Sequence, residues 1–185
     1  MKIPVCLLGC VLLCPVLALA ADPFNYNYLE LGYQNQSPQN GSTIKGPDLA
    51  LSYTVYSQLQ VVGGYAHLTQ PLVTGNNYYF GIRGENTFGT ATDFYTDILY
   101  LNQHISSQGA GSTDNGYRLA LGLRHLFSRW VEFDGSVGHN WLNQSSNDAT
   151  VGLLFNATSW LAAGVSYSHS SATNNTTSLR VRFYY

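Results

Sequence analysis

The chain has 185 residues, a formal net charge of -2 and only 10% charged residues, against roughly 25% in ordinary soluble domains, while tyrosine alone occurs 14 times. A charge near zero argues against nucleic acid as a partner, because phosphate binding relies on clustered Lys and Arg. Beyond the first twenty residues, no apolar stretch approaches the ~20 residues that a membrane-spanning helix needs, which excludes a helical membrane protein. We therefore expect something other than water to face much of the surface.

The first twenty residues predict a cleaved signal peptide. Met1-Lys2 supplies a positive start, an apolar run follows, and Ala18-Leu19-Ala20 is a small-x-small cleavage site. The segment Leu7-Leu8-Gly9-Cys10 resembles a lipoprotein processing site, but few apolar residues precede it. We expect residues 21–185 to form one exported domain. All three cysteines lie in the leader, so the mature domain can form neither a disulfide nor a thiolate metal site, and we expect no metal and no cofactor.

An alternation of period two dominates the rest of the chain, with clusters of Gly, Asn, Ser, Thr and Pro between the alternating segments. It predicts ten strands: Asn25 to Asn35, Thr43 to Val55, Leu59 to Thr69, Asn76 to Glu85, Asp93 to His104, Gly116 to Leu126, Trp130 to Leu142, Ala149 to Asn156, Trp160 to Ser170 and Thr177 to Tyr185. These leave no room for a helix or a second domain, so the predicted fold is all-β. Eight strands is the alternative count, because residues 76–93 are the least clearly punctuated.

The expected connections alternate in length. Five are longer and polar: Gln36 to Ser42, Gln70 to Gly75, Ile105 to Asn115, Asn143 to Asp148 and Ser171 to Thr176. The others are tight, except for a longer turn from Asn86 to Thr92. Short turns at one end and longer loops at the other are typical of an up-and-down membrane barrel, with the turns in the periplasm and the loops outside.

The two faces of a strand differ in the same way throughout the chain. The segment Gly116 to Leu126 carries Tyr117, Leu119, Leu121 and Leu123 on one face and Arg118, Ala120, Gly122 and Arg124 on the other. Small residues beside the charges suit the crowded concave side of a barrel, so the charges are expected to point inward and the apolar face to meet lipid. The prediction is a transmembrane antiparallel β-barrel; a soluble sandwich with an aromatic core is the alternative.

Aromatic residues support the membrane interpretation. They are expected in two belts on the apolar face, with Tyr33, Tyr65, Tyr78, Tyr100, Tyr117, Trp141 and Tyr167 near the loops and Tyr53, Phe94, Phe155 and Tyr185 near the turns. Two aromatic girdles around an aliphatic band are the signature of a spanning barrel.

The last strand ends on an alternating apolar row, Leu179, Val181, Phe183 and Tyr185. This row resembles the C-terminal signal of Gram-negative outer-membrane β-barrels, which the barrel assembly machinery reads, although most such barrels end in Phe. With the leader and the strand pattern, the chain resembles the small outer-membrane β-barrel proteins of the OmpX and OmpA type. The resemblance implies an integral outer-membrane protein with periplasmic termini, in contact with lipid and lipopolysaccharide, and assembled by that machinery. The sequence carries no signal for an oligomeric state.

Strand parity places a nearly balanced set of charges in the lumen: Glu30, Asp48, Glu85, Asp97, Glu132, Asp134, Arg83, Arg118, Arg124, Arg180 and Arg182. Lone buried charges are costly, so we expect an interlocked, paired plug. Barrel closure makes Glu30 the leading partner for Arg180 or Arg182. A small porin or narrow channel is the alternative, but a selective pore usually shows rings of one sign.

Four histidines fall near the loop ends of alternate strands, on the apolar parity: His67, His104, His139 and His169. Alternate strands are not adjacent, so the four cannot converge on one metal. The expected role is an interfacial belt, and the sharper hypothesis is contact with lipopolysaccharide phosphates.

One enzymatic hypothesis involves His169 and Ser171, which share a strand face and could act as base and nucleophile. The arrangement is similar to the His-x-Ser pair of outer-membrane lipid A deacylases, which implies a lipid A-modifying hydrolase with Asn174 or Asn175 as oxyanion donor. No acid follows Asp148 to complete a triad, and only Asp114 and Asp148 are expected in the loops, which argues against a protease at the rim. We therefore expect a non-enzymatic protein with a structural or surface-interaction role.

Overall fold

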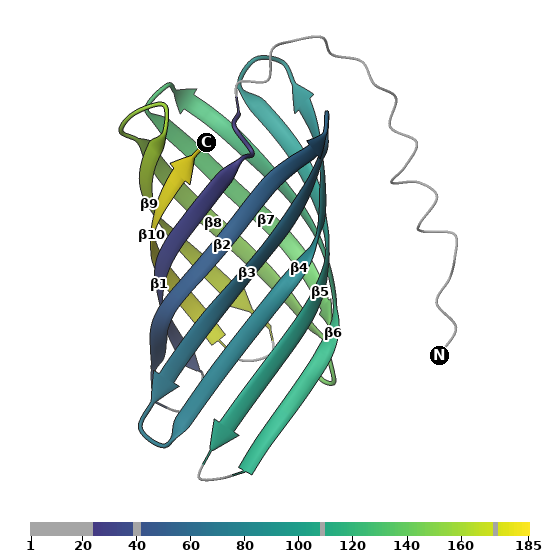
Figure 1. Cartoon of the computed structure of the whole chain (residues 1–185), viewed down its shortest axis with the longest axis vertical. Coiled ribbons are helices and arrows are strands. Elements are labelled where there is room, and N and C mark those ends of the chain that lie inside the picture. The colour runs from purple at the N-terminus through teal and green to yellow at the C-terminus, as the bar shows by residue number, and fades with distance from the viewer. Residues whose placement is uncertain (1–23, 39–41, 108–109, 172–173) are drawn as a thin grey trace, which may run out of the picture.

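The computed structural model describes residues 24–38, 42–107, 110–171 and 174–185; the predicted leader with its cysteines lies outside these ranges. The described chain forms ten strands: β1 (Tyr28–Pro38), β2 (Ile44–Tyr56), β3 (Leu59–Gln70), β4 (Val73–Phe88), β5 (Thr92–Ser107), β6 (Ala110–Ser128), β7 (Val131–Trp141), β8 (Ser146–Asn156), β9 (Leu161–Ser170) and β10 (Asn174–Tyr184). Each strand pairs antiparallel with its neighbours in sequence, and β1 pairs with β10, so the sheet closes into a barrel (Figure 1). The predicted all-β antiparallel barrel is confirmed, with ten strands rather than eight. No helix in the described ranges is long and apolar enough to cross a membrane.

The seam between β1 and β10 is continuous from Tyr28 opposite Tyr184 to Pro38 opposite Asn174. Strand β1 begins and β10 ends at the same end of the barrel, here the terminal end (Figure 1). The turns β2–β3, β4–β5, β6–β7 and β8–β9 also lie at the terminal end, and the other five connections lie at the opposite, distal end. A closed sheet of this kind leaves no unpaired edge along its barrel wall.

Several predicted connections are wrong in length because the strands continue into them. The largest error is the predicted loop from Ile105 to Asn115: β5 runs to Ser107 and β6 starts at Ala110, and β6 pairs with β5 along the whole of β5. Polar composition rich in Ser and Gly is typical of loops, but it also fits a strand that is solvated on both faces. At the terminal end the predicted turn from Asn86 to Thr92 shortens to residues 89–91, where Gly89 adopts φ 73°, a conformation that costs glycine little.

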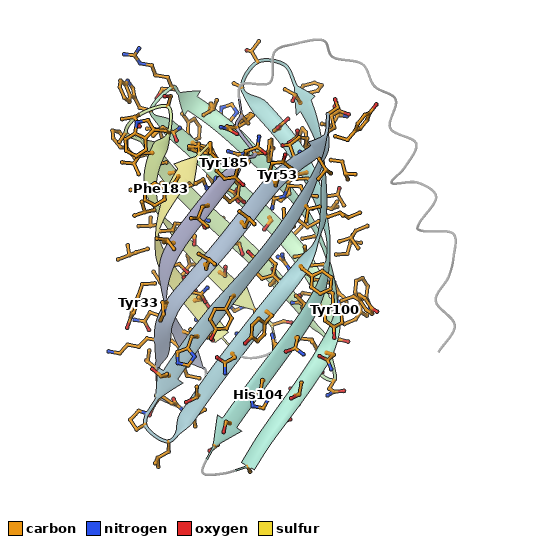
Figure 2. The ribbon with its side chains drawn as sticks, viewed as in Figure 1. Tyr33, Tyr53, Tyr100, His104, Phe183 and Tyr185 are labelled. Carbon is orange, nitrogen blue, oxygen red and sulfur yellow. The ribbon has the colours of Figure 1, made fainter. Side chains whose placement is uncertain are left out.

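The outward face of the barrel is apolar and aromatic. Figure 2 shows Tyr33 and Tyr100 toward the distal end and Tyr53, Phe183 and Tyr185 toward the terminal end. Outward aliphatic side chains lie between the aromatic residues and include Leu121, Val151, Leu153, Val165 and Val181. The outward row of β10 contains Leu179, Val181 and Phe183, and Tyr185 follows it; the Tyr185 hydroxyl donates to the carbonyl of Ser52 at 3.3 Å. The exposed apolar band with aromatic ends is the surface expected of a lipid-embedded barrel.

Candidate functional site

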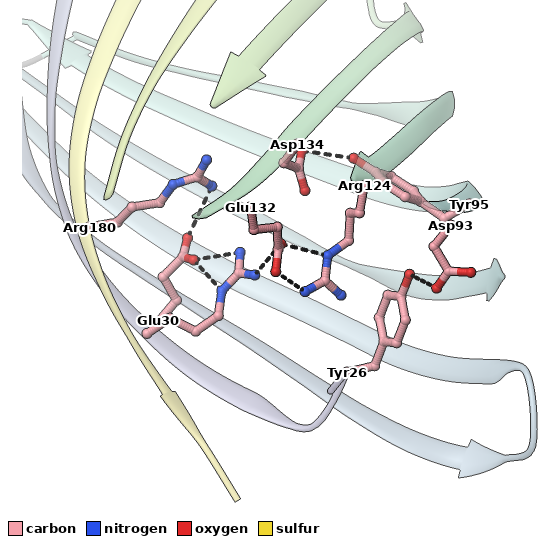
Figure 3. A network of polar contacts seen from close by, with 9 residues as sticks. Tyr26, Glu30, Asp93, Tyr95, Arg124, Glu132, Asp134 and Arg180 are labelled. Carbon is pink, nitrogen blue, oxygen red and sulfur yellow. Dashed lines mark hydrogen bonds and ion pairs between the residues drawn. The ribbon is translucent and has the colours of Figure 1, made fainter. Parts of the chain in front are cut away.

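The most deeply buried charges form a chain across the lumen near the terminal end, called here the lumenal charge chain: Glu30 (β1), Arg182 (β10), Glu132 (β7) and Arg124 (β6). Arg182 lies 2.8 Å from the Glu30 carboxylate and 3.8 Å from that of Glu132. Arg124 donates from Nε and Nη2 to the two oxygens of Glu132 at 2.8 and 3.0 Å (Figure 3). Arg124 is 1% and Glu132 2% exposed, so these bidentate bonds replace hydration that the charges have lost.

Residues 24–27, which precede β1, cap this chain. The Arg124 guanidinium lies 4.8 Å from the ring centroid of Phe24 and 4.5 Å from that of Tyr26. The Tyr26 hydroxyl donates to Asp93 at 2.6 Å, and both aromatic side chains are buried. Burial raises the pKa of Tyr26, so its phenol stays protonated and remains a donor. The first strand was predicted to begin at Asn25, but this segment instead places its aromatic rings over a buried cation.

A second group joins β4, β5 and β7 beside the charge chain. Arg83 donates to both oxygens of Asp97 at 2.7 and 2.9 Å, and its guanidinium lies 4.0 Å from the ring centroid of Tyr95. The Tyr95 hydroxyl in turn donates to Asp134 at 3.1 Å (Figure 3). The Tyr95 ring occupies the space beside Gly122 of β6, where a Cβ atom would collide with it. Small inward residues thus make room for the long side chains of neighbouring strands.

The distal half of the lumen is less charged. Arg118 donates to Asp148 at 2.6 Å, and the Asn140 amide donates to the same carboxylate at 2.8 Å. Asp148 was predicted to lie in a loop, which is wrong: it belongs to β8 and has inward parity. Arg180 reaches Glu30 at 3.5 Å. The remaining inward side chains here are mostly small and polar, among them Thr150, Ser166, Ser168 and Ser178.

The structure therefore brings eight of the eleven predicted lumenal residues into ion pairs: Glu30, Arg83, Asp97, Arg118, Arg124, Glu132, Arg180 and Arg182. Asp134 binds Tyr95, Glu85 is buried, and the Asp48 carboxylate fills the space beside Gly32. The sequence pattern did not predict the lumenal positions of Asp93, Asp148 and Tyr26. Parity could have found Asp93, which shares its face with Tyr95 and Asp97, but the position of Tyr26 before β1 left no signal for its contact.

His169 and Ser171, the hypothetical base and nucleophile, each bind another residue. The Nδ1 atom of His169 lies 2.7 Å from the side-chain oxygen of Asn175. The Ser171 hydroxyl accepts the backbone N–H of Asn147 at 2.9 Å. Both line a groove on the outward face of β6 to β9, so they share a surface, and each is held by a different asparagine.

No protein-family model matches the chain, and no curated protein matches it in sequence. Solved structures match its fold. The KdgM porin in complex with disordered oligogalacturonate aligns over 84% of this chain and 99% of its own, with a TM-score of 0.50 and 12% identity. Neisserial surface protein A aligns over 85% and 95%, with a TM-score of 0.43 and 12% identity. The N-terminal β-barrel domain of Pseudomonas aeruginosa OprF aligns over 88% and 100%, with a TM-score of 0.44 and 13% identity.

The closed ten-stranded barrel, its apolar outer surface and the match to the KdgM porin define the fold. The chain is an all-β protein whose closed, ten-stranded antiparallel barrel has the fold of the KdgM porin. At an identity of 12%, the match shows a shared fold and nothing about function. The role of this protein must therefore be inferred from its own residues.

Proposed function

We propose that this protein is a non-enzymatic outer-membrane barrel with a structural or surface-interaction role, whose lumen is closed by charge pairing. The lumenal charge chain supports this proposal most directly, because four buried, mutually compensated side chains cross the lumen between β1 and β6. The rings of Phe24 and Tyr26 cover Arg124 on one side. Opening a path for ions would separate buried charges from their partners, at a cost of several kcal/mol. The outward row of Leu179, Val181, Phe183 and Tyr185 is proposed as the assembly signal.

The terminal end is proposed to face the periplasm. The strands project farthest at the distal end, where β5 and β6 extend as a polar hairpin (Figure 1), and outer-membrane barrels carry their longer connections outside. An epitope tag placed after Leu142, in the β7–β8 connection, should be detected by antibody on intact cells. A tag after Arg129, in the β6–β7 turn, is the matched control and should need permeabilised cells. The reverse pattern would overturn the orientation.

A planar-bilayer measurement tests the closed lumen. The purified barrel, shown to be folded by its heat-dependent migration on a detergent gel, is expected to give no stable unitary conductance steps. A reference porin inserted in the same bilayer shows that the assay detects an open lumen. Stable steps from this protein would contradict the closed lumen and favour the second candidate function.

That second candidate is a small porin. The small polar side chains of the distal half favour a porin, because a lining of this kind can be hydrated. Among them, the hydroxyls of Thr150 and Ser168 lie 2.6 Å apart. The fold match to the KdgM porin agrees with it at the level of the fold. The closed lumen is the better proposal because the buried ion pairs lie on the path that a solute would take.

A further inference from the structure

A basic side chain recurs on the outward face of every distal hairpin. In each of the five hairpins, this basic side chain is paired with an Asn or Thr on the partner strand. Both residues of each pair lie within four positions of the distal end of their strands. The pairs are Asn35 and Lys45, His67 and Asn76, His104 and Thr113, His139 and Asn147, and His169 and Asn175. Figure 2 shows His104 farther toward the distal end than Tyr33 and Tyr100, on the longest hairpin. These ten residues are called the distal collar.

Hydrogen bonds fix the imidazoles of the collar in one orientation. The Nδ1 atoms of His67, His139 and His169 lie 2.8, 2.7 and 2.7 Å from the amide oxygens of their asparagines. His104 makes the corresponding contact with Thr113 at 2.9 Å. An amide oxygen only accepts, so a hydrogen bond to asparagine requires the proton on Nδ1 of His67, His139 and His169 and leaves Nε2 to face an outside ligand. The Thr113 hydroxyl can donate or accept, so its bond is compatible with either tautomer of His104. When the ring gains a second proton, Nε2 becomes a charged donor while the bond to asparagine is kept.

The acidic side chains of the described strands all lie on the inward face, whereas basic side chains lie on both faces. The chain has ten acids; one, Asp22, lies outside the described residues, and the other nine all have inward parity. The outward face of the described strands therefore carries basic groups and no acidic side chain of outward parity. The inward Asp148 also borders the groove between β6 and β9, and its carboxylate is bound by Arg118 and Asn140. Only two other basic side chains, His125 and Arg129, have outward or turn positions there, and both lie toward the terminal end. The ligand that suits the collar is an anion.

The surroundings of the collar indicate what carries the anion. The groove between β6 and β9 has apolar walls that include Leu119, Leu121 and Val137, and its polar side holds His139 and His169. Outward tyrosines share the collar's end of the barrel, with the aliphatic band beyond them. A ligand that fills both parts has anionic groups at the interface and acyl chains along the barrel wall.

We propose that the distal collar binds the phosphate groups of the acylated glycolipid in the outer leaflet, with the acyl chains packed on the aliphatic band. The collar would hold a ring of this lipid around the barrel, through charge-assisted hydrogen bonds from Nε2 and Lys45. The assignment of the outer leaflet rests on the proposed orientation. The binding of phosphate by the collar is inferred only from the collar residues. The orientation of the barrel and the binding of phosphate can therefore be disproved separately.

The test uses the folded barrel in nanodiscs and lipid A as probe. The variant H67Q/H104Q/H139Q/H169Q/K45Q should lower the apparent affinity for lipid A at pH 6 by about tenfold or more, the equivalent of at least one charge-assisted hydrogen bond. The matched control H125Q/R129Q removes two cations from the terminal end and should leave binding unchanged. Dephosphorylated lipid A should bind the native chain as weakly as lipid A binds the five-site variant. Inorganic phosphate and phosphatidylglycerol, as competitors, should displace little lipid A.

Acidification provides a readout that a merely structural collar would not give. From pH 7.5 to 5.5, lipid A affinity should rise for the native chain relative to the five-site variant, because imidazoles gain charge in this range. The variant corrects for protonation of the phosphates themselves. The other titratable groups on this face are the phenols of Tyr33, Tyr65, Tyr78, Tyr100, Tyr117 and Tyr167 and the ammonium of Lys45.

Equal affinity of the native chain and the five-site variant, both with native heat-dependent migration, would overturn the proposal. Equal binding of dephosphorylated lipid A would do the same, because it would assign the affinity to the acyl chains. Displacement by inorganic phosphate or phosphatidylglycerol would show a general anion site and also contradict a glycolipid collar. If lipid A binds as expected but the β7–β8 tag is hidden on intact cells, the orientation fails while phosphate recognition stands.

Discussion

Replacing Glu132 with Gln is expected to lower the free energy of unfolding by about 3–5 kcal/mol, the usual cost of leaving a buried charge without its partner. The Glu132 carboxylate accepts hydrogen bonds from Nε and Nη2 of Arg124 and also lies 3.8 Å from Arg182. Arg182 keeps Glu30, but Arg124 loses its carboxylate while remaining 1% exposed. Urea unfolding in lipid vesicles, with the folded fraction measured by gel migration, provides the test.

Asp134→Asn is the matched control, two residues along the same strand. Asn keeps an oxygen that can accept from Tyr95, so the expected loss is about 1 kcal/mol or less. The double change Arg124→Met with Glu132→Leu should recover part of the loss, because it removes both charges together. If Glu132→Gln costs no more than Asp134→Asn, the lumenal charge chain does not stabilise the barrel.

Gly122→Val is expected to lower the free energy of unfolding by about 3 kcal/mol or more, because the valine overpacks the lumen and displaces Tyr95 from its hydrogen bond to Asp134. The Tyr95 ring fills the position of the new Cβ. It cannot move away without giving up its hydroxyl bond to Asp134 and its stacking on Arg83. The same urea titration gives the value.

Gly84→Val is the matched control, because a Cβ at Gly84 of β4 meets no atom within 4 Å. Valine favours strands, so this change should be tolerated. Adding Tyr95→Ala to Gly122→Val should restore part of the lost stability, since it vacates the space that the valine needs. A Gly122→Val barrel as stable as the Gly84→Val barrel would show that the ring is free to move.

Local alternation was sufficient to predict the two faces of the barrel. Period two is a property of each strand alone, so Arg118 and Arg124 could be placed inward and Leu119 and Leu121 outward without knowing any neighbour. Closure of the sheet then made Glu30 a neighbour of the last strand, where the structure places it against Arg182. The length of the β5–β6 hairpin could not be predicted, because a polar strand and a polar loop have the same composition.

Partner choice in the lumen needed the register and the curvature of the closed sheet. Arg124 lies directly opposite Asp134 in the β6–β7 ladder, yet it binds Glu132 diagonally. Arg118 reaches across β7 to Asp148 of β8 by lying over Gly138. The sequence by itself determined the alternation of the strands, the polarity of each strand face and the aromatic belts, because these depend on neighbours along the chain. Only the tertiary structure decided which charges meet and where Phe24 and Tyr26 lie, because those contacts join residues that closure alone brings together.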